Sequence, residues 1–413
     1  MTNIKPSIDL RREVLSNLLA TYEKRVYDVA YRDTLRPLLE ADMPQLLETP
    51  NFENEIHERL LRVGIFPTAF EHEENRIIEL RRLISATFHE VARTEPRWVF
   101  QDVHPHGLAA SNGVKSGDEL LAINDTPVRP PIKPAVPANV VSQLAFQNGN
   151  GTKALKVDPS EFGARRSNPL AYWLIHRDRR EYAHASILAG NIGYVRVAEF
   201  PGLVGVDMAN QIDAAFRRVR QCGRLIVDIR GNPGGGTANL RLMTHLTPER
   251  VPVGYSLTRP RTETGYRREE LPQFTRIPRS RLTLPFAVWK YRKLDKSIVV
   301  VTEGRKRRPY DGKIVMLVNE HTTSGAEIVA GFAADHQLAT LVGTRTRGRL
   351  LGHSRFAVGH GYFVTIPVSN YVTWEGKTFE GTGVVPKIEV PFDAVTAKAG
   401  RDCQLEQAMN VLG

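Results

Sequence analysis

The sequence predicts an α/β protein of two or three domains, on three observations. Between residues 192 and 343, short apolar runs alternate with helical patterns, which is typical of a mostly parallel sheet with helices packed against it. Residues 8–93 show helical periodicity, and from Trp98 onward the pattern changes to that of strands. With 413 residues, of which 41% are hydrophobic, the chain is long enough to bury a large core.

Residues 1–94 are expected to form a helical N-terminal domain. Apolar side chains recur at helical spacing along this stretch, first at Val14, Leu18 and Tyr22 and again around Leu80 and Ile84. One interpretation is a lid, a dimerisation arm or a tether for substrate. The other is a cap that packs on the core.

Residues 95–165 are expected to form a small strand-rich domain and a linker rich in Pro, Asn and Gly. The turn at Gly117 and Asp118, the strand after it and the hairpin at Asn124 and Asp125 resemble the centre of a PDZ domain. PDZ domains bind extended C-termini by strand addition and hold the terminal carboxylate with backbone amides. No carboxylate-binding loop is recognisable before the first strand, so this domain either binds peptides or gates and packs against the core.

Residues 166–413 carry the alternating pattern and are expected to form the core. The predicted strands are residues 192–197, 225–230, 314–319 and 340–343, the predicted helices are residues 206–218, 237–246 and 324–336, and a hairpin is predicted over residues 356–374.

Ser324 lies where the predicted strand 314–319 passes through a polar turn into the next helix. A serine there projects its hydroxyl from the sheet, and the amides of Gly325 and Ala326 remain unpaired at the positive end of the helix. Such amides can hold an oxyanion, which makes Ser324 a candidate nucleophile. The alternative is an N-cap serine with no chemical role.

A glycine run follows the predicted strand 225–230, at Gly234, Gly235 and Gly236. Glycines let backbone amides approach a ligand closely, so Gly235 is expected to supply the other half of an oxyanion hole. The spacing fits neither the P-loop nor the dinucleotide-binding pattern.

Taken together and in this order, these motifs resemble those of the C-terminal processing (tail-specific) serine peptidases. The matching stretches are Asp228-Ile-Arg-Gly-Asn-Pro-Gly-Gly, Ser324-Gly-Ala-Glu-Ile, Gly343-Thr-Arg-Thr-Arg-Gly and Gly381-Thr-Gly-Val-Val-Pro. The resemblance covers roughly residues 95–413. It implies a ClpP/crotonase-like core beside the PDZ-like domain, and it implies no cofactor.

The residue expected to act as general base departs from the family. The family places a lysine 25 residues after the serine, and this position is Arg349, whose guanidinium stays protonated near neutral pH. The family's glutamine four residues further on is His353, which an extended strand would place on the same face as Arg349. Because imidazole titrates near pH 6.5, we expect a Ser324/His353 pair with Arg349 as an electrostatic helper. Alternatively, His353 is a bystander, and the base lies elsewhere or does not exist.

A related branch, the tricorn-like peptidases, takes its base from a histidine in a Gly-Tyr-x-His strand, where this chain has Arg196. The same branch uses a glutamate shortly before its terminal Gly-x-x-Pro, and Glu380 stands in the matching place. Glu380 is therefore either an auxiliary catalytic group or a solvated carboxylate in a turn.

Composition and charge indicate which binding partners and which cellular compartment are expected. No stretch is long and apolar enough for a membrane span. The N-terminus lacks the apolar core of a signal peptide. The cytoplasm is therefore the expected compartment, unless a leader has been removed for export. The net charge of +11 favours anionic partners, but the basic runs at residues 259–281 and 290–308 lack interleaved aromatic residues, so no nucleic-acid partner is expected. Neither the two cysteines nor His104 and His106 have the spacing of a metal site.

The sequence thus predicts a serine endopeptidase that cleaves protein or peptide substrates near their C-termini through an acyl-enzyme on Ser324, with the amides of Gly235 and Gly325 holding the oxyanion. A homo-oligomer is compatible with this prediction. The main alternative is an inactive relative that binds peptides, because the family lysine is replaced. A hydratase or acyl-transfer role is disfavoured, since a coenzyme A enzyme of this fold does not need a serine at position 324.

Overall fold

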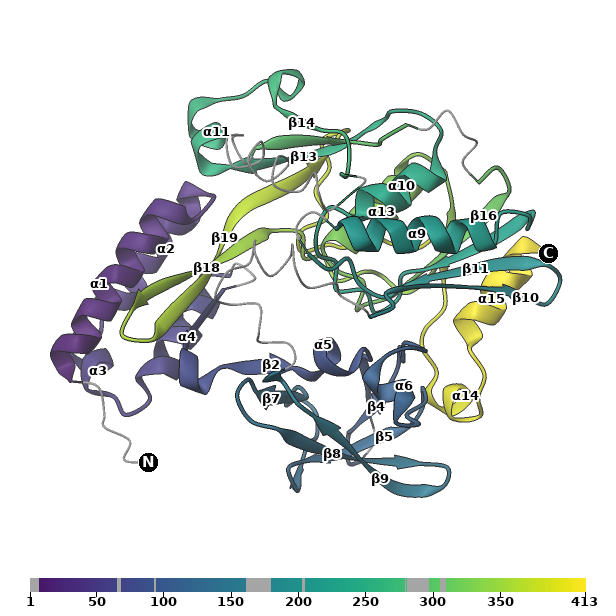
Figure 1. The fold of residues 1–413 in the computed structure, drawn as a ribbon. Helices are drawn as coiled ribbons and strands as arrows, with labels where there is room; N and C mark the ends of the chain where they lie inside the picture. The colour runs from purple at the N-terminus through teal and green to yellow at the C-terminus, as the bar shows by residue number, and fades with distance from the viewer. Residues whose placement is uncertain are drawn as a thin grey trace.

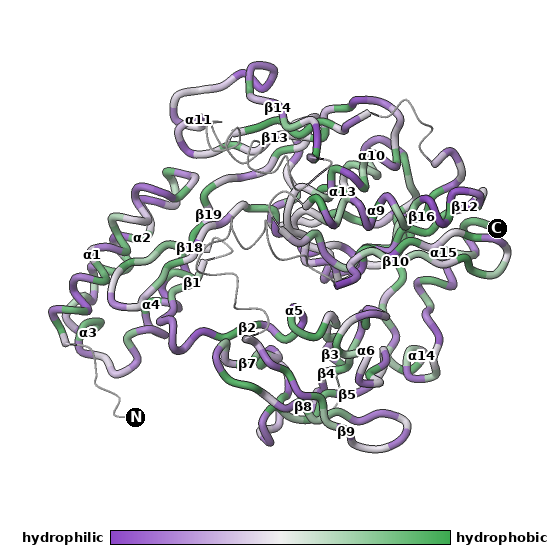
Figure 2. Tube along the Cα trace, viewed as in Figure 1, coloured by the Kyte–Doolittle hydropathy of each residue, from purple (hydrophilic) through white to green (hydrophobic). Residues whose placement is uncertain are grey.

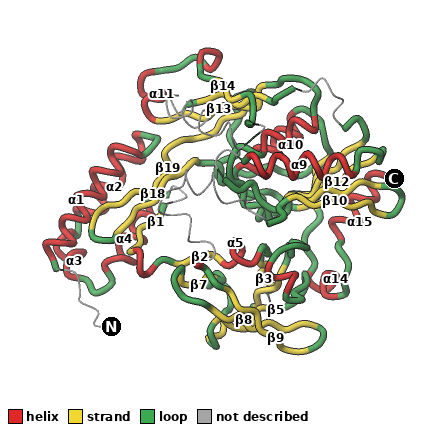
Figure 3. The backbone as a smooth tube through the Cα atoms, viewed as in Figure 1, coloured by secondary structure: helices red, strands yellow, loops and turns green. Residues whose placement is uncertain are grey.

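The computed structural model describes residues 7–64, 68–92, 94–160, 180–202, 205–278, 280, 297–304 and 310–413. Helices and strands are mixed along the chain, which confirms the predicted α/β class (Figures 1 and 3). The expected domain boundary at residue 165 and most of the basic run 290–308 lie outside the described residues. No described helix combines the length and the apolar character that crossing a bilayer requires.

The core sheet has six strands in the order β10-β11-β12-β16-β17-β20. Only β10 and β11 pair antiparallel, and all other neighbours in this sheet run parallel. The four predicted strands are found within one or two residues of their expected ends, as β11 (Ile192–Val197), β12 (Arg224–Asp228), β16 (Lys313–Val318) and β17 (Thr340–Gly343). The edge strands β10 (Ala183–Leu188) and β20 (Ile388–Glu389) were not predicted.

Helices cover both faces of this sheet (Figure 1). On one face lie α9 (Val206–Arg218), α10 (Asn239–Leu246) and α13 (Gly325–Asp335), and on the other lies α15 (Cys403–Leu412), preceded by α14 (Ala394–Lys398). Along β16, Met316 packs with the first group of helices and Leu317 with α15. Successive residues are therefore both buried, which explains why the central strands are continuous apolar runs (green in Figure 2).

A second sheet lies between the core and the N-terminal helices, in the order β1-β19-β13-β15-β14 with β18 paired to β19. Its strands are β1 (Ala69–His72), β13 (Pro252–Thr258), β14 (Gln273–Phe274), β15 (Ile298–Val301), β18 (Gly352–Gly359) and β19 (Tyr362–Thr373), and α11 (Arg259–Thr264) and η2 (Arg268–Glu270) follow β13. The predicted hairpin is the β18–β19 pair.

Four N-terminal helices pack on the β18–β19 hairpin (Figure 1). They are α1 (Ile8–Arg25), α2 (Val29–Glu40), α3 (Met43–Glu48) and α4 (Phe52–Arg62). Val14 and Leu18 of α1 share one buried cluster with Val358 and Val364 of the hairpin. This arrangement favours the packing-cap interpretation of the N-terminal helices.

The prediction of helix up to residue 94 is wrong beyond α4. Residues 69–91 form β1, η1 (Glu73–Asn75), β2 (Ile77–Glu79), α5 (Leu80–Ile84) and β3 (Phe88–Val91). Strand β1 pairs with β19, where Ala69 lies opposite Thr365, and β2 pairs with β7, where Ile77 lies opposite Pro137. These partners lie far along the chain, so tertiary pairing overrides the local helical pattern.

Residues 85–157, termed the small-sheet module below, contain the sheet β3-β4-β5-β8-β9 with β6 paired to β5. Its further elements are β4 (Arg97–Phe100), α6 (Leu108–Ser111), β5 (Glu119–Ile123), β6 (Thr126–Pro127), β7 (Ala135–Pro137), β8 (Ser142–Asn148) and β9 (Gly151–Val157). Asn124 and Asp125 both have positive φ, as a two-residue hairpin turn requires. The sheet begins at Phe88 rather than at residue 95, and its relation to PDZ domains remains a prediction.

A buried ion network ties β12 to the start of α15. The carboxylate of Asp228 is fully buried and accepts hydrogen bonds from Arg196 at 2.7 Å and from the Arg230 guanidinium at 2.7 and 3.0 Å. Arg230 also donates to Asp402 at 2.8 and 2.9 Å. Burial alone would raise the pKa of Asp228, but the two guanidinium groups hold it well below its usual range. The network therefore stays charged at neutral pH and fixes the strand end that leads into the glycine run.

Candidate active site

Ser324 stands immediately before α13 with a backbone conformation of φ 55° and ψ −121°. An ordinary N-cap residue is extended, with negative φ. A non-glycine residue at such a positive φ carries strain of about 1–3 kcal/mol, which persists only where the surroundings impose it. This conformation is typical of a strained strand-to-helix nucleophile turn, and it differs from that of a plain helix cap.

The carboxylate of Glu327 holds the Ser324 turn against the segment that carries Arg349. Glu327 is fully buried. One of its oxygens accepts from the amides of Ser324 and Arg349, both at 2.9 Å, and the other accepts from the Thr346 hydroxyl at 2.7 Å and the Gly348 amide at 2.6 Å. Four donors thus share one carboxylate. The Ser-x-x-Glu spacing, a capping-box signature, was the available signal for this role.

We expect Glu327→Gln to lower the free energy of unfolding by about 3 kcal/mol, because an amide group would face two buried donors and each orphaned donor costs about 1–3 kcal/mol. The same change should lower peptidase turnover, since the Ser324 turn loses its support. Urea unfolding of the variant measures the first effect. Glu375→Gln, at an exposed residue, is the matched control and should change stability by less than about 0.5 kcal/mol.

The glycine run after β12 lies against the Ser324 turn. A Cβ added to Gly234 would come within 2.7 Å of both the Gly325 nitrogen and the Ser324 Cβ, so only glycine allows this approach. The Gly235 nitrogen lies 3.5 Å from the position that a Cβ of Gly325 would occupy. Within the described part of the chain, neither the Gly235 nor the Gly325 amide donates to a protein acceptor. The two amides are therefore adjacent and unpaired.

Arg349 lies in the loop between β17 and β18. Its backbone amide donates a hydrogen bond to the Glu327 carboxylate. Burial, together with the neighbouring positive charge of Arg347, lowers the pKa of the Arg349 side chain to about 10, although the carboxylate of Glu79 acts in the opposite direction. The guanidinium still keeps its proton at neutral pH. Arg349 therefore places a positive charge at the position that the sequence resemblance assigns to the family lysine, and it cannot accept a proton from Ser324.

His353 is the second residue of β18, has an exposed side chain and lies opposite Pro367 of β19. The prediction that Arg349 and His353 share one strand face is wrong, because β18 starts only at Gly352 and its register shifts between Gly352 and His353. The protein packed around the ring lowers the pKa of His353, and the charge of Arg82 lowers it further. Among the described residues, the structure gives no hydrogen bond between His353 and Ser324.

Glu380 is half-buried and bonded to the backbone, in contrast to the solvated carboxylate of the alternative interpretation. One of its oxygens accepts from the amides of Leu350 and Leu351 at 2.5 and 3.1 Å. Burial raises the pKa of Glu380. Glu380 thus fixes the backbone between Arg349 and His353.

Residues 191–390 match the family model described as peptidase family S41. This part of the chain belongs to peptidase family S41. The matched segment runs from β11 to β20 and includes the Ser324 turn, the glycine run and Arg349.

Curated S41-related proteins and solved structures resemble the chain over larger parts. Tricorn protease homolog 1 of Streptomyces coelicolor is 26% identical over 311 residues, which is 72% of this chain and 24% of that protein. The carboxyl-terminal-processing protease of Synechocystis is 27% identical over 230 residues, which is 54% of this chain and 44% of that protein. The chain thus spans less than half the length of either relative. The photosystem II D1 C-terminal processing protease has a similar fold, with a TM-score of 0.55 at 17% identity over 98% of this chain and 97% of that one.

In this S41 segment, Arg196 lies on β11 at the position that the sequence resemblance assigns to the tricorn-like histidine. Its side chain is buried and donates to Asp228 at 2.7 Å. Burial alone would lower its pKa, but the carboxylates of Asp228 and Asp102 together with Tyr194 raise it above its usual value. Arg196 therefore stays a cation and belongs to the ion network of β12.

Sequence reasoning missed a buried link between the small-sheet module and the S41 core. The Asp102 carboxylate accepts from Thr87 at 2.6 Å and from the Asn319 side chain at 2.7 Å. The Asn319 oxygen accepts from the Gly231 amide at 2.9 Å. One amide side chain thus joins the module, the backbone just before the glycine run and the turn before Ser324. No local signal marks it, because Asp102 and Asn319 are 217 residues apart in the sequence.

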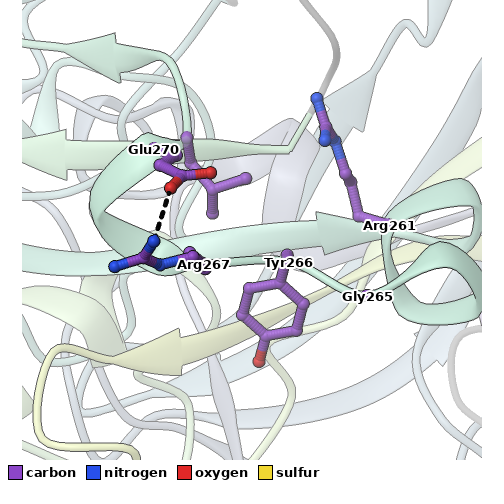
Figure 4. A pocket seen from close by; sticks show the side chains of 6 residues that line it. Arg261, Gly265, Tyr266, Arg267 and Glu270 are labelled. Carbon is purple, nitrogen blue, oxygen red and sulfur yellow. Dashed lines mark ion pairs between the residues drawn. The ribbon is translucent and has the colours of Figure 1, made fainter.

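Two pockets differ in their relation to this site. The pocket in Figure 4, of about 260 Å³, lies on α11 and the loop after it, with Arg267 and Glu270 paired at 3.1 Å, and none of its lining residues belongs to the Ser324 turn. A second pocket lies between α5 and residues 230–233, which precede the glycine run, and is lined by Arg82, Asp102 and Gly231 among others. This second pocket therefore lies beside the link through Asp102 and Gly231, and its lining does not include the Ser324 turn.

Proposed function

We propose that the chain is a serine endopeptidase of the C-terminal processing type that acts through an acyl-enzyme on Ser324. The observation that carries the proposal is the strained Ser324 beside the unpaired amides of Gly235 and Gly325. In the proposed reaction, the Ser324 hydroxyl attacks the scissile carbonyl, and both amides donate to the oxyanion. The amine leaves with a proton, and water then hydrolyses the ester. The match of residues 191–390 to peptidase family S41 supports this reaction class.

For the proton transfer we propose His353 as base, with Arg349 as a fixed positive charge nearby. A lowered pKa keeps the His353 ring neutral at physiological pH, as a base requires. Closure of the gap to Ser324 would be a step of substrate binding, since catalytic hydrogen bonds often tighten only in the complex. Glu380 would act indirectly, through the backbone that carries both residues.

Labelling with a fluorophosphonate tests the proposal, because only an activated serine reacts. We expect one label per chain, located on Ser324 by peptide mass spectrometry. Ser324→Ala should remove the label, and Ser354→Ala should keep it. A wild-type protein that stays unlabelled under conditions where a serine peptidase standard reacts would contradict the proposal.

The replacement of the family lysine by Arg349 favours one second candidate, an inactive relative that binds peptides. Its support is that, within the described residues, no base is hydrogen-bonded to the Ser324 side chain at the start of α13. This candidate predicts no labelling together with retained binding of an unstructured peptide. Fluorescence anisotropy with a labelled peptide separates the two proposals.

We further propose that substrates are recognised by their C-terminal carboxylate. Arg81 and Arg82 of α5 line the pocket beside residues 230–233, which precede the glycine run, so a negative group would be attracted there. Strand addition to the small-sheet module would place the same carboxylate against backbone amides.

Amidation of the C-terminus of a test peptide should weaken its binding about tenfold or more, because charge-assisted hydrogen bonds contribute about 1.5–3 kcal/mol each. Isothermal titration with the free and the amidated peptide measures the effect. Equal affinities would argue against recognition of the carboxylate and would leave the module a packing or gating role.

A further inference from the structure

His106, Glu181 and His184 form a cluster of metal-ligating side chains outside the candidate active site. The Nε2 atom of His106 lies 3.0 Å from Nδ1 of His184, which in turn lies 3.2 Å from a carboxylate oxygen of Glu181. One ligand atom from each residue lies within 4.8 Å of the other two. Two imidazoles and one carboxylate are a common donor set for a divalent transition metal.

The spacing of these donors fits one small ion. Zinc binds imidazole nitrogen at about 2.0–2.1 Å and carboxylate oxygen at about 2.0–2.2 Å, so tetrahedral ligands lie roughly 3.3 Å apart. Two of the three separations, 3.0 and 3.2 Å, differ from this by a few tenths of an ångström, and the third, between His106 and Glu181, is within 4.8 Å. The side chains of His106 and Glu181 are 41% and 44% exposed, which leaves room for water as a fourth ligand.

The backbone under each donor is held by hydrogen bonds. The amide of His106 donates to Nδ1 of the buried His104, whose own amide donates to the Ser85 carbonyl. On either side of Glu181, the carbonyl of Arg180 and the amide of Tyr182 are bonded to the Gln211 side chain at 2.9 and 2.8 Å. A site built on fixed backbone loses little conformational entropy when it binds an ion.

The donors belong to two parts of the fold. His106 lies in the small-sheet module, between β4 and α6, whereas His184 lies on β10 of the core sheet, opposite Arg196 of β11. The two histidines are 78 residues apart in the sequence, which is why the spacing of His104 and His106 predicted no metal site. An ion held here would join the module to the core at a point separate from the link between Asp102 and Asn319.

We propose that His106, Glu181 and His184 bind one Zn²⁺-like transition-metal ion, and that this ion clamps the small-sheet module to the core sheet. Neutral imidazole nitrogens and the ionised carboxylate are the ligands. Mg²⁺ is a poor occupant, because it prefers oxygen donors in octahedral geometry. The proposal does not depend on peptidase activity.

Metal titration of the tag-free, chelator-treated protein tests the site. Co²⁺ should bind with a stoichiometry of one and produce visible absorption that Zn²⁺ removes and Mg²⁺ does not. His106→Asn, Glu181→Gln and His184→Asn should each weaken Zn²⁺ binding by about a hundredfold or more, since even outer-shell changes cost 10–100-fold. His360→Asn, which removes an exposed histidine that is paired with Glu13, should bind as the wild type does. Unchanged affinity in the three variants would overturn the site.

Hydrogen exchange tests the clamp separately from the site. Zn²⁺ should slow amide exchange both in α6 of the module and in β10 of the core, and His184→Asn should abolish both effects. Because the three side chains are at least a quarter exposed, these variants are expected to fold, and their circular dichroism verifies this. Protection confined to one of the two segments would show a surface site that does not join them and would overturn the clamp.

Discussion

Ser324→Ala should leave the protein folded and lower turnover of an unstructured protein substrate by at least about 10⁴-fold, since removal of a nucleophile leaves only the contribution of the oxyanion donors and substrate binding. The Gly235 and Gly325 amides remain in the variant and account for any residual rate. Turnover is measured with casein or a quenched fluorescent peptide, and folding by thermal unfolding. Retained proteolysis would exclude Ser324 as nucleophile.

A second substitution at the same position separates catalysis from helix capping. Ser324 has a φ of 55°, so Ser324→Gly should raise the free energy of unfolding by about 1 kcal/mol through relief of backbone strain, while activity is still lost. If Ser324 served only as a cap, alanine would cost about 0.5–2 kcal/mol and activity would persist. Ser354→Ala on β18 is the control and should change neither quantity.

The core strands could be predicted from the sequence because their signal is local. Burial on both faces makes β12 and β16 continuous apolar runs, and glycines or small polar residues mark their ends. The strands β1 and β2 could not be predicted, because their stability comes from β19 and β7. Local periodicity around Leu80 favoured a long helix, and only the five-residue α5 is helical there.

The same distinction between local signals and long-range contacts applies to the candidate site. The Ser324 turn and the glycine run were predicted because both depend on local backbone geometry at strand ends. Their proximity rests on β12 and β16 being parallel neighbours, which brings the two strand ends to one edge. The relation between Arg349 and His353 was predicted wrongly, because the irregularity at Gly352 depends on pairing with β19. The links through Glu327 and Asn319 depend on contacts that no single segment encodes.

The identity of the base is tested by a pH profile, and His353→Gln should lower turnover about a hundredfold or more. A histidine base must be neutral, so the rate should be present above the pKa of His353 and lost as the pH falls through it. The protein packed around the ring and the charge of Arg82 lower this pKa, which places the acid limb below the usual histidine value of about 6.5. Arg82→Gln removes that charge, raises the pKa and should move the acid limb to higher pH, whereas Arg12→Gln on the exposed face of α1 should not.

The double variant Arg349→Lys/His353→Gln completes this test, because it restores the lysine and glutamine at the positions that the resemblance assigns to the base. A lysine is protonated at neutral pH unless its surroundings lower its pKa from about 10.4, so activity in this variant should rise only toward alkaline pH. Recovery of turnover with such a shifted profile, measured against His353→Gln alone, would identify His353 as the natural replacement of the family base. Near-normal turnover and an unchanged profile in His353→Gln would instead exclude this histidine, and Glu380→Gln would then test the remaining candidate.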